Sequence, residues 1–514
     1  MVWYLAGGRA RGDRTTQTSV ADRNAPMNLD ARLLAGRYGL APHGSHEDVK
    51  VGGWRSDAFS VLVCVFLCVA LMAGGSSSDA VSAGIVQFSS APILGIGLWR
   101  LFDRPVSPGI FWLLIIMVAT AAFVLVQMAP LPPEVWRALP GRRMLVDGYA
   151  AAGMTLPWLP ISLAPWATQN AALGLIPPAA MICAVASLEE SARRALVVSM
   201  AIIAIISVGL GVMQITGGAD SPLRIYPFTN RDSAVGFFAN RNHQAAFLAA
   251  AIPLAPLLMM RMNGRDGRQN FFWVAAAGGF ILVVSVGAAT TGSRAGALLV
   301  VLGFLGAVVI AARAWRRRWA PAAALAATAA LTAGLIVLSG NTVLVDRLRM
   351  NPGNDGRLTI SPIVATAAAA FAPLGSGVGS FPVVYQIFEH EETLAPAYIN
   401  HAHNEYLELW MECGWAGVAL MGAFLAWWCT AGFAAFRARP SEAAALRMAG
   451  ALIVGMFLLH SIVDYPLRTP ALATVFGLAC SLMLQPPLER RIGSPGANNQ
   501  NPGRQPMDEG GGDP

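Results

Sequence analysis

The feature that most constrains this chain is a series of long apolar segments that recurs between residues 58 and 485. Most of these segments have about 17 to 22 residues, which is enough for a helix to cross a hydrocarbon layer of roughly 30 Å. The segments are continuously apolar rather than alternating, and backbone groups in lipid must be bonded within the segment, so helices are favoured over a β-barrel. The segments lie at 58–73, 81–99, 109–129, 169–187, 195–213, 243–260, 271–290, 295–312, 320–339, 408–436, 446–463 and 470–485.

The composition agrees with an integral membrane protein, because 55% of the residues are hydrophobic, 13% are charged and the mean hydropathy is +0.53. The predicted fold is all-α: a polytopic helical bundle of about twelve transmembrane helices, with one large loop outside the cytoplasm that contains short helices. We predict a membrane domain at 55–487 between disordered cytoplasmic tails at 1–54 and 488–514.

The cysteines and the net charge exclude several other classes of protein. The six cysteines lie in or beside the apolar segments, so neither a disulfide framework nor a thiolate metal site is expected. The net charge of +7 favours contact with anionic membrane lipid, and no aromatic-interleaved surface for nucleic acid is present.

The positions of Arg in short loops predict the orientation of the helices. Placing both chain ends in the cytoplasm puts most arginine clusters on the cytoplasmic side. The opposite face then receives the loops at 130–168, 214–242, 291–294, 340–407 and 464–469. In the largest of these, a helix at 358–372 is too short to span, and the glycine-rich stretch at 375–381 is expected to form a tight turn.

Several arginines lie on this opposite face against the general trend, which favours a polyanionic ligand, because the planar guanidinium suits phosphate oxygens. Arg241, Arg294 and Arg357 have few acidic neighbours in sequence, and each lies beside a helix end or a glycine-containing turn. We therefore predict that these three bind anionic ligand. Four other arginines on this face are expected to pair with nearby aspartates or to reach lipid headgroups. These arginines are Arg224, Arg231, Arg347 and Arg349, and the nearby aspartates are Asp220, Asp232, Asp346 and Asp355.

Four segments together resemble the bacterial O-antigen ligase and O-antigen polymerase superfamily. They are GFFANRNHQAAFLAAAIPL at 236–254, TTGSRAGALLV at 290–300, GRLTISPIVATAAAAFAPLGSGVGSFP at 356–382 and HAHNEYLELWMECGWAG at 401–417. The resemblance covers roughly residues 230–470 and is strongest at 275–430.

The resemblance implies a multi-pass enzyme of the bacterial inner membrane whose active site and large loop, 340–407, face the periplasm. Such enzymes are inverting glycosyltransferases that need no metal or other cofactor. They take a glycan from an undecaprenyl-pyrophosphate carrier and join it to an acceptor glycan or to lipid A core.

The resemblance also suggests which residues form the site. The pyrophosphate-binding arginines of the superfamily correspond to Arg294, which follows Ser293, and to Arg357. The His-Asn pair of the superfamily corresponds to His403 and Asn404. The Asn-x-Asn element falls on Asn240 and Asn242, with Arg241 between them as a further pyrophosphate ligand. The supporting residues are Asn240, Asn242, Ser293, His401, Asn404, Glu408 and Arg468.

Transfer from a diphosphate-linked sugar needs a base for the acceptor hydroxyl and cations for the departing diphosphate. His403 is the predicted base, because a histidine changes charge near neutral pH, and Glu405 or Glu408 is expected to orient it. Glu405, Glu408 and Glu412 fall within roughly 60° of arc on a helix, so they should form one acidic stripe facing the bundle interior. Asn404 is expected to cap this helix, with the first glutamates favoured by its dipole.

Other interpretations of these residues remain open. His401, His403 and Glu405, with Glu389 or His390, are an alternative metal site, although ligands at this spacing do not converge from a helix. His243 is expected to pack at a helix end. His460 and Asp464 lie one turn apart and are expected to bond each other, with Arg468 near the rim of the site.

The function also has alternatives. Within the superfamily, a ligase acting on lipid A core, an O-antigen or exopolysaccharide polymerase and a protein O-glycosylating ligase are not separated by the sequence. A small-anion transporter is the main alternative of another class, and a non-catalytic scaffold is a third. Charged residues cluster at one face rather than near the bilayer midplane, and no internal repeat is visible, which favours the enzyme.

Overall fold

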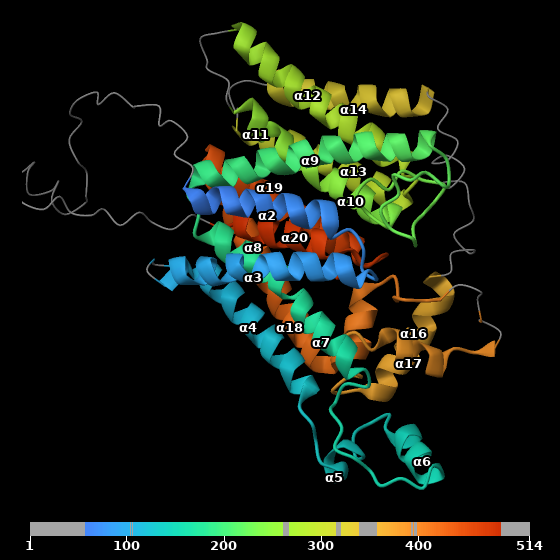
Figure 1. Cartoon of the computed structure of the whole chain (residues 1–514). Coiled ribbons are helices and arrows are strands. Elements are labelled where there is room, and N and C mark those ends of the chain that lie inside the picture. The colour runs from blue at the N-terminus through green and yellow to red at the C-terminus, as the bar shows by residue number, and fades with distance from the viewer. Residues whose placement is uncertain are drawn as a thin grey trace, which may run out of the picture. The chain divides into compact units, whose positions relative to one another are not determined.

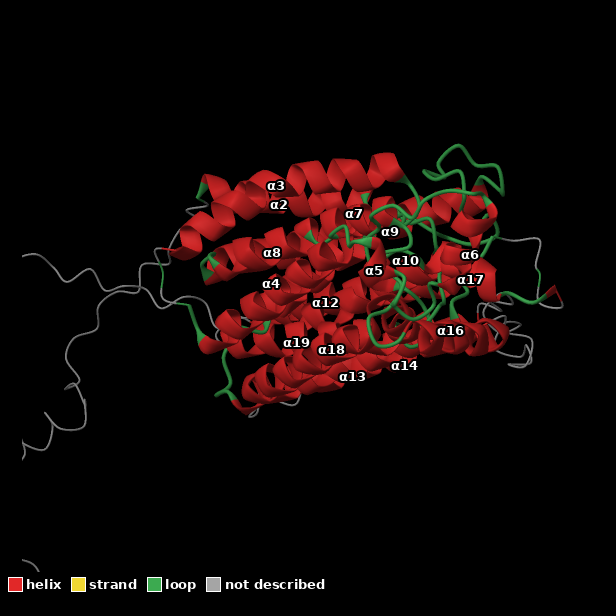
Figure 2. Ribbon diagram, turned by 90° about the horizontal axis from the view of Figure 1, so that it is seen from below, coloured by secondary structure: helices red, strands yellow, loops and turns green. Residues whose placement is uncertain are grey.

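The structure, a computed structural model, describes residues 57–102, 104, 106–260, 267–314, 320–338, 357–391, 394 and 398–484, and this part of the chain is built from helices (Figure 1). The tails predicted at 1–54 and 488–514 lie outside the described residues. Over the described part, extended backbone forms a single isolated bridge between Leu131 and Leu159, and Figure 2 contains no strand. The predicted all-α class is confirmed.

Every predicted apolar segment contains a helix. These helices are α2 (Ala58–Ala73), α3 (Ala80–Phe102), α4 (Pro108–Met128), α7 (Pro165–Gly174) with α8 (Ile176–Ala186), α9 (Glu190–Thr216), α10 (Arg241–Ala251) with η1 (Ile252–Leu254) and α11 (Ala255–Met259), α12 (Gly267–Thr290), α13 (Arg294–Ala314), α14 (Ala320–Leu338), α18 (Glu405–Arg437), α19 (Glu442–His460) and α20 (Pro470–Leu482). Within the described residues, 9 spans are long and apolar enough to cross a membrane. The apolar stretches of α2, α14 and α20 are shorter, at Ala58–Ala73, Pro321–Gly334 and Pro470–Leu482.

The membrane core depends on small residues where helices approach closely. A side chain at Gly97 of α3 would meet the backbone of Cys183 and Ala184 in α8, and one at Gly477 of α20 would meet Pro178. Lipid offers no hydrophobic driving force between helices, so such close backbone approach is what packs them. The result is one continuous buried cluster that includes Leu67, Ile93, Met181, Phe247 and Phe457.

A second, separate core lies in the predicted large loop. Here α16 (Arg357–Phe371) and α17 (Phe381–Phe388) pack on the beginning of α18 around Val364, Phe371, Phe381 and Met411. The short helix and the tight turn that follows it are therefore both confirmed. The turn has positive φ angles of 82° at Gly375, 103° at Gly377 and 83° at Gly379, a conformation in which glycine carries no steric penalty.

A kink divides α18. Gly414 has φ 57° and ψ −150°, and the amide of Trp415 donates to the carbonyl of Pro373 at 2.9 Å instead of continuing the helix. A Cβ at Gly414 would overlap the carbonyl oxygen of Pro373, so only glycine fits here. The first part of α18, which carries Glu405, Glu408 and Glu412, thus belongs to the second core, and the part after the kink enters the membrane core.

The loops predicted to share one face of the bundle contact each other. Thr168 donates from its hydroxyl to the carbonyl of Val378 at 2.6 Å, and Asn242 donates to the carboxylate of Asp464 at 2.6 Å. The amide of Ala234 reaches the carbonyl of Thr290, at the end of α12, at 3.5 Å. We call this end of the helices the loop face. These contacts support the predicted grouping of the loops.

The segment 130–168 also joins the loop face. It contains α5 (Pro133–Trp136) and α6 (Arg143–Ala151), which lie beyond the ends of α4 and α7 (Figure 1). Arg142 is buried, donates to the carbonyl of Ile161 and lies 5.9 Å from the ring centroid of Phe371 in α16. Burial lowers the pKa of this guanidinium to about 10, and the arginine ties the segment to the second core.

Candidate functional site

The centre of the site is the carboxylate of Asp464, which lies just after α19 and has a fully buried side chain. Its Oδ1 lies 3.1 Å from Nδ1 of His403, and its Oδ2 accepts from Nδ2 of Asn242 at 2.6 Å. The guanidinium of Arg357 approaches the same Oδ2 at 3.8 Å. Asp464 therefore brings together residues from α10, α16, the loop before α18 and the loop after α19.

Asp464 is held in its ionised form. Burial acts to raise its pKa, but the hydrogen bond with His403 and the neighbouring histidines act in the other direction, and the net pKa lies well below its usual range. An ionised carboxylate only accepts hydrogen bonds, so Nδ1 of His403 carries the hydrogen in this contact. In the neutral imidazole, Nε2 then has its lone pair free to accept a proton.

His403 adopts an unusual backbone conformation. Its φ is 50°, and it is the one non-glycine residue with positive φ among the described residues. Such a conformation is uncommon outside glycine and Asn and persists where surrounding contacts enforce it, often at functional sites. The side chain remains 29% exposed, so the ring is fixed on one side and accessible on the other.

The three predicted anion-binding arginines share a structural position. Arg241, Arg294 and Arg357 are the first residues of α10, α13 and α16 respectively. The backbone amides and the positive end of the dipole at a helix start also favour an anion. The arrangement supports the predicted relation of these arginines to helix ends, and α13 packs directly along α10.

Two of these arginines, which have few acidic neighbours in sequence, each approach a carboxylate in the folded chain. Arg241 lies 3.8 Å from Asp232, and Arg357 lies 3.8 Å from Asp464. Chain folding brings Asp464 close to Arg357, although the two residues are far apart in sequence. Among the arginines expected to be paired, Arg231 binds Asp220 at 2.9 Å, whereas Arg224 donates to backbone carbonyls, including that of Asn230 at 3.1 Å. Arg347 and Arg349 lie outside the described residues.

The asparagines and Ser293 have distinct positions. Asn240 caps α10, since its side chain accepts from the amide of Asn242 at 2.8 Å, while Asn242 itself reaches Asp464. Ser293 accepts from the amide of Gly296 at 3.0 Å and so caps α13, which orients Arg294 at the helix start. Asn404 caps α18, as predicted, by accepting from the amides of Tyr406 and Leu407 at 3.1 Å each.

The predicted choice of carboxylate to orient His403 is wrong. Glu405 accepts instead from the hydroxyl of Ser461 at 2.5 Å and from the amide of Leu467 at 2.8 Å. Glu408 binds Nδ1 of His401 at 2.8 Å. His403 precedes the helix and has a left-handed backbone with φ 50°, and its ring contacts Asp464 rather than the glutamates.

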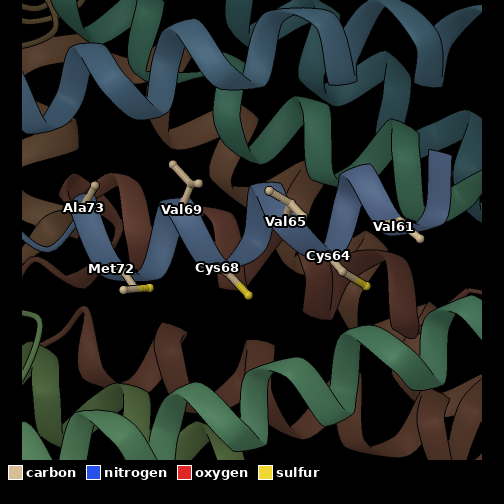
Figure 3. Close-up of a pocket in the computed structure, with 7 residues that line it drawn as sticks. All are labelled: Val61, Cys64, Val65, Cys68, Val69, Met72 and Ala73. Atoms are coloured by element: carbon tan, nitrogen blue, oxygen red, sulfur yellow. The ribbon is translucent and has the colours of Figure 1, made fainter. Parts of the chain in front are cut away.

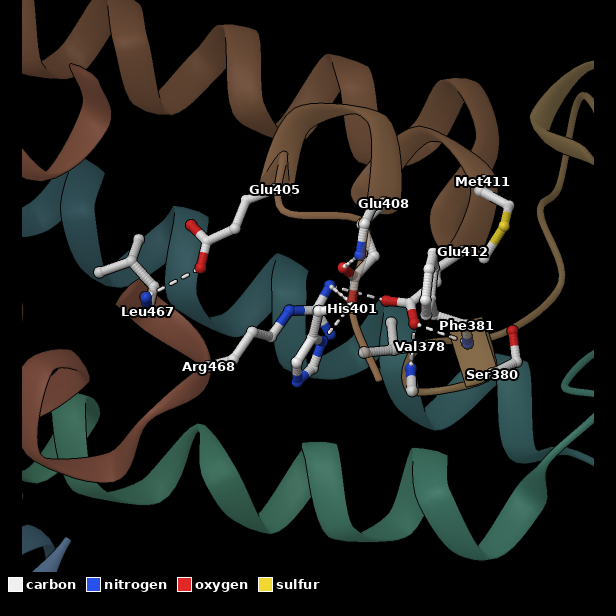
Figure 4. Close-up of polar contacts among 12 residues, drawn as sticks. Val378, Ser380, Phe381, His401, Glu405, Glu408, Met411, Glu412, Leu467 and Arg468 are labelled. Atoms are coloured by element: carbon white, nitrogen blue, oxygen red, sulfur yellow. Dashed lines mark hydrogen bonds and ion pairs between the residues drawn. The ribbon is translucent and has the colours of Figure 1, made fainter. Parts of the chain in front are cut away.

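The glutamates instead form a buried anchoring cluster, shown in Figure 4. Glu405, Glu408 and Glu412 are all buried and project from one side of α18, as the stripe predicts. Arg468 lies 2.8 Å from Glu412 and 3.4 Å from Glu408. Burial acts to lower the pKa of Arg468, but the two carboxylates act more strongly and raise it, so its charge is permanent.

This anchoring cluster fixes three loops around the first part of α18. Glu412 accepts from the amides of Gly379 and Phe381 at 2.8 and 3.2 Å, which holds the glycine turn. Glu408 accepts from the amide of Ala402 at 2.9 Å, which holds the loop that carries His403. Glu405, through Leu467, holds the loop after α19. Arg468 supplies one positive charge to this cluster of three glutamates.

Tyr465 packs among the histidines. Its ring centroid lies 4.2 Å from that of His401 and 5.0 Å from those of His403 and His243. Burial, followed by the charge of Asp464, raises the pKa of its phenol to about 12, so it stays neutral. Tyr465 therefore fills the space behind His403 and limits the positions that the imidazole adopts.

His460 and Asp464 are bonded through the backbone, since the amide of Asp464 donates to the carbonyl of His460 at 2.9 Å, but their side chains do not bond each other. Both oxygens of Asp464 are engaged by His403 and Asn242, and neither ring nitrogen of His460 makes a hydrogen bond with the described residues. His243 is buried in the same way and packs edge-on against Tyr465, which agrees with its predicted packing role. The described residues contain no group of three or more His, Cys, Asp or Glu arranged to hold a metal ion.

Sequence reasoning did not identify Asp464 as the partner of His403, nor Tyr465 as a packing partner. A signal was present in the segment HSIVDYPLRTP at 460–470, where charged and aromatic residues follow an apolar helix on the same predicted face as His403. It did not reveal which histidine Asp464 contacts, because 61 residues separate Asp464 from His403.

The apolar helices define a multi-pass membrane protein, and His403 and Arg357 both approach the carboxylate of Asp464 beside the ends of these helices. Residues 278–422 match the family model described as O-Antigen ligase, and this match supports a relation of the chain to the O-antigen ligase-related superfamily. The matched segment contains Arg294, Arg357 and His403, whereas Asn242 and Asp464 lie outside it. None of the curated proteins compared with the chain matches it.

Proposed function

We propose that this protein is a glycosyltransferase of the bacterial inner membrane that transfers a glycan from an undecaprenyl-pyrophosphate carrier to an acceptor sugar on the periplasmic side. The observation that carries the proposal is the contact of His403 with Asp464, within reach of Arg357 and Asn242, in a chain related to O-antigen ligases. The acceptor is a glycan or the core of lipid A.

The residues support a one-step reaction. The acceptor oxygen attacks the anomeric carbon while the bond from that carbon to the diphosphate oxygen breaks, and the diphosphate leaves with the bonding electrons. The proton of the acceptor hydroxyl passes to Nε2 of His403, and Asp464 stabilises the imidazolium that forms. Attack from the side opposite the leaving group inverts the anomeric carbon.

The departing diphosphate requires positive charge and oriented donors. Arg241, Arg294 and Arg357 carry fixed charge at three helix starts, where backbone amides also point toward an anion. Preorganised guanidinium groups stabilise developing charge without reorganisation, which is the role that a divalent cation has in other phosphoryl sites. We therefore expect transfer to continue after exhaustive chelation of divalent metals.

The surface glycans of a deletion strain test the proposal and separate its two forms. Loss of long chains from lipid A core, with the carrier-linked polymer retained, indicates a ligase. Accumulation of single-repeat products indicates a polymerase. In either case the wild-type gene should restore the profile and the His403→Asn variant should not. An unchanged profile in the deletion strain, in cells that make such glycans, would contradict the proposal.

A further inference from the structure

A wholly apolar groove lies along α2, outside the polar site. Its volume is about 420 Å³, and it is lined from Val61 to Ala73 by one face of the helix, which includes Cys64, Cys68 and Met72 (Figure 3). The helix rises by ~18 Å over these residues at 1.5 Å per residue. The groove therefore follows most of the length of α2.

The helix α9 borders the groove. α2 packs against α9, and Cys64 lies within hydrogen-bonding reach of Ser199 on α9. Figure 3 shows Cys64, Cys68 and Met72 directed toward the neighbouring green helix. On the α2 side, Val65 and Met72 are 53% and 47% exposed, so the protein leaves this face open to an apolar ligand.

Both helices that border the groove end on the segment that leads into the candidate site. After α2, the carbonyl of Gly75 accepts from the amide of Ala239 at 3.0 Å. Near the end of α9, Oε1 of Gln214 accepts from the amides of Val235 and Gly236 at 3.2 and 2.9 Å. The segment Val235–Ala239 is thus clamped between the ends of α2 and α9.

This segment continues directly into the polar site. Asn240 caps α10, Arg241 begins it, and Asn242 bonds Asp464 at 2.6 Å. The loop after α2 also approaches the other side of the site, because Ser78 lies 3.5 Å from Nδ2 of Asn400. The groove on α2 therefore ends beside a loop that bonds directly to the segment preceding Arg241, where the diphosphate of a ligand would bind.

We propose that the groove along α2 binds the first isoprene units of the polyprenyl chain of the donor. This inference rests on the proposed function, since it assigns the lipid part of the same substrate. An isoprenoid is a flexible, unsaturated chain without polar groups, and it matches a long groove whose lining offers only aliphatic and sulfur-containing side chains.

A photo-crosslinking experiment tests binding without requiring turnover. The full-length protein in lipid nanodiscs is incubated with undecaprenyl diphosphate that carries a diazirine near the head of its isoprenoid chain, irradiated and digested for mass spectrometry. We expect labels on Val61–Ala73 that unlabelled undecaprenyl diphosphate displaces and excess phosphatidylglycerol does not. Labels elsewhere, or equal displacement by phosphatidylglycerol, would mean that α2 contacts bilayer lipid only and would overturn the proposal.

A kinetic experiment tests the role of the groove in transfer. Cys68→Trp fills the groove, and Ile85→Trp places the same ring on the 47% exposed Ile85 of α3 as a matched control. With glycan donors of identical head group, Cys68→Trp should raise KM about 10-fold for the undecaprenyl donor and leave KM unchanged for a farnesyl donor. The control should change neither.

The outcomes distinguish the two proposals. Equal effects of Cys68→Trp on both donors, or no effect on either in a variant that elutes as the wild type does, would reject the groove while leaving transfer itself intact. Absence of transfer by the wild type with every donor would instead reject the proposed function, and the crosslinking result would still decide the groove.

Discussion

The residue that controls the candidate site is Asp464, because it accepts from the imidazole of His403 and from the side-chain NH2 group of Asn242 at the same time. Replacing it with Asn keeps the size of the side chain but removes the charge and lets an NH2 group face the imidazole. The ring then loses the partner that fixes its hydrogen on Nδ1. We expect Asp464→Asn to lower kcat by ~100-fold or more, measured as glycan transfer by the purified protein.

Asp464 also makes stability depend on pH in a defined direction. Its pKa is lower in the folded protein than in the unfolded chain, so the folded state favours the charged form. Its contribution to the free energy of unfolding is complete above the unfolded value of about 3.9 and declines as the pH falls below it. The difference in melting temperature between wild type and Asp464→Asn should therefore shrink below about pH 4. A difference that grows on acidification would contradict the assignment.

The arginines at the helix starts should not tolerate lysine. A lysine keeps the charge at position 294 or 357 but presents a point charge in place of a planar fork. We expect Arg294→Lys and Arg357→Lys each to lower kcat/KM for the carrier-linked donor by ~10-fold. Arg143→Lys, at an α6 residue whose side chain is 95% exposed, is the control and should behave as the wild type.

Among the elements, α18 shows what local sequence determines and what it does not. The cap at Asn404 and the buried face that carries Glu405, Glu408 and Glu412 follow from residue type and spacing, and both are confirmed. The break at Gly414 does not follow from spacing, because a lone glycine in an apolar segment is compatible with an unbroken helix. It arises from the contact with Pro373, which lies in the turn between α16 and α17.

The kink gives a prediction with an internal control. Gly414→Ala would combine a φ of 57° with overlap of the Pro373 carbonyl, so we expect a loss of ~3 kcal/mol in stability. Gly422→Ala lies in the same helix, and a Cβ there would meet nothing within 4 Å, so it should be neutral or stabilise the helix by ~0.5 to 1 kcal/mol. Thermal unfolding of both variants in detergent tests this account. Similar effects of the two substitutions on stability would contradict it.

For the whole molecule, the apolar segments, their order and the shared face of the loops could be predicted from the sequence, because hydropathy and arginine placement are local signals. The pairing of His403 with Asp464 could not, since it depends on how the ends of α10, α16, α18 and α19 meet. For the same reason Glu405 and Glu408, near His403 in sequence, were the wrong choice of partner.

The loop face can be tested as a unit. Met154 and Phe228 are 60% and 86% exposed in two of the loops predicted to share it. We expect cysteines at both positions to react with a membrane-impermeant maleimide in intact spheroplasts. A cysteine at Ala438, beyond the opposite end of α18, should react only after permeabilisation. Opposite accessibility of positions 154 and 228 would contradict the shared face.

The central claim is that His403 accepts the proton of the acceptor sugar during transfer from a polyprenyl diphosphate. The direct measurement is product formation by purified protein in liposomes with a defined undecaprenyl-diphosphate glycan and its acceptor. His403→Asn is the informative variant, because asparagine tolerates the left-handed backbone at φ 50°. The account predicts transfer by the wild type and a loss of ~100-fold to ~10,000-fold in the variant at unchanged melting temperature. Transfer at the wild-type rate by His403→Asn would contradict it.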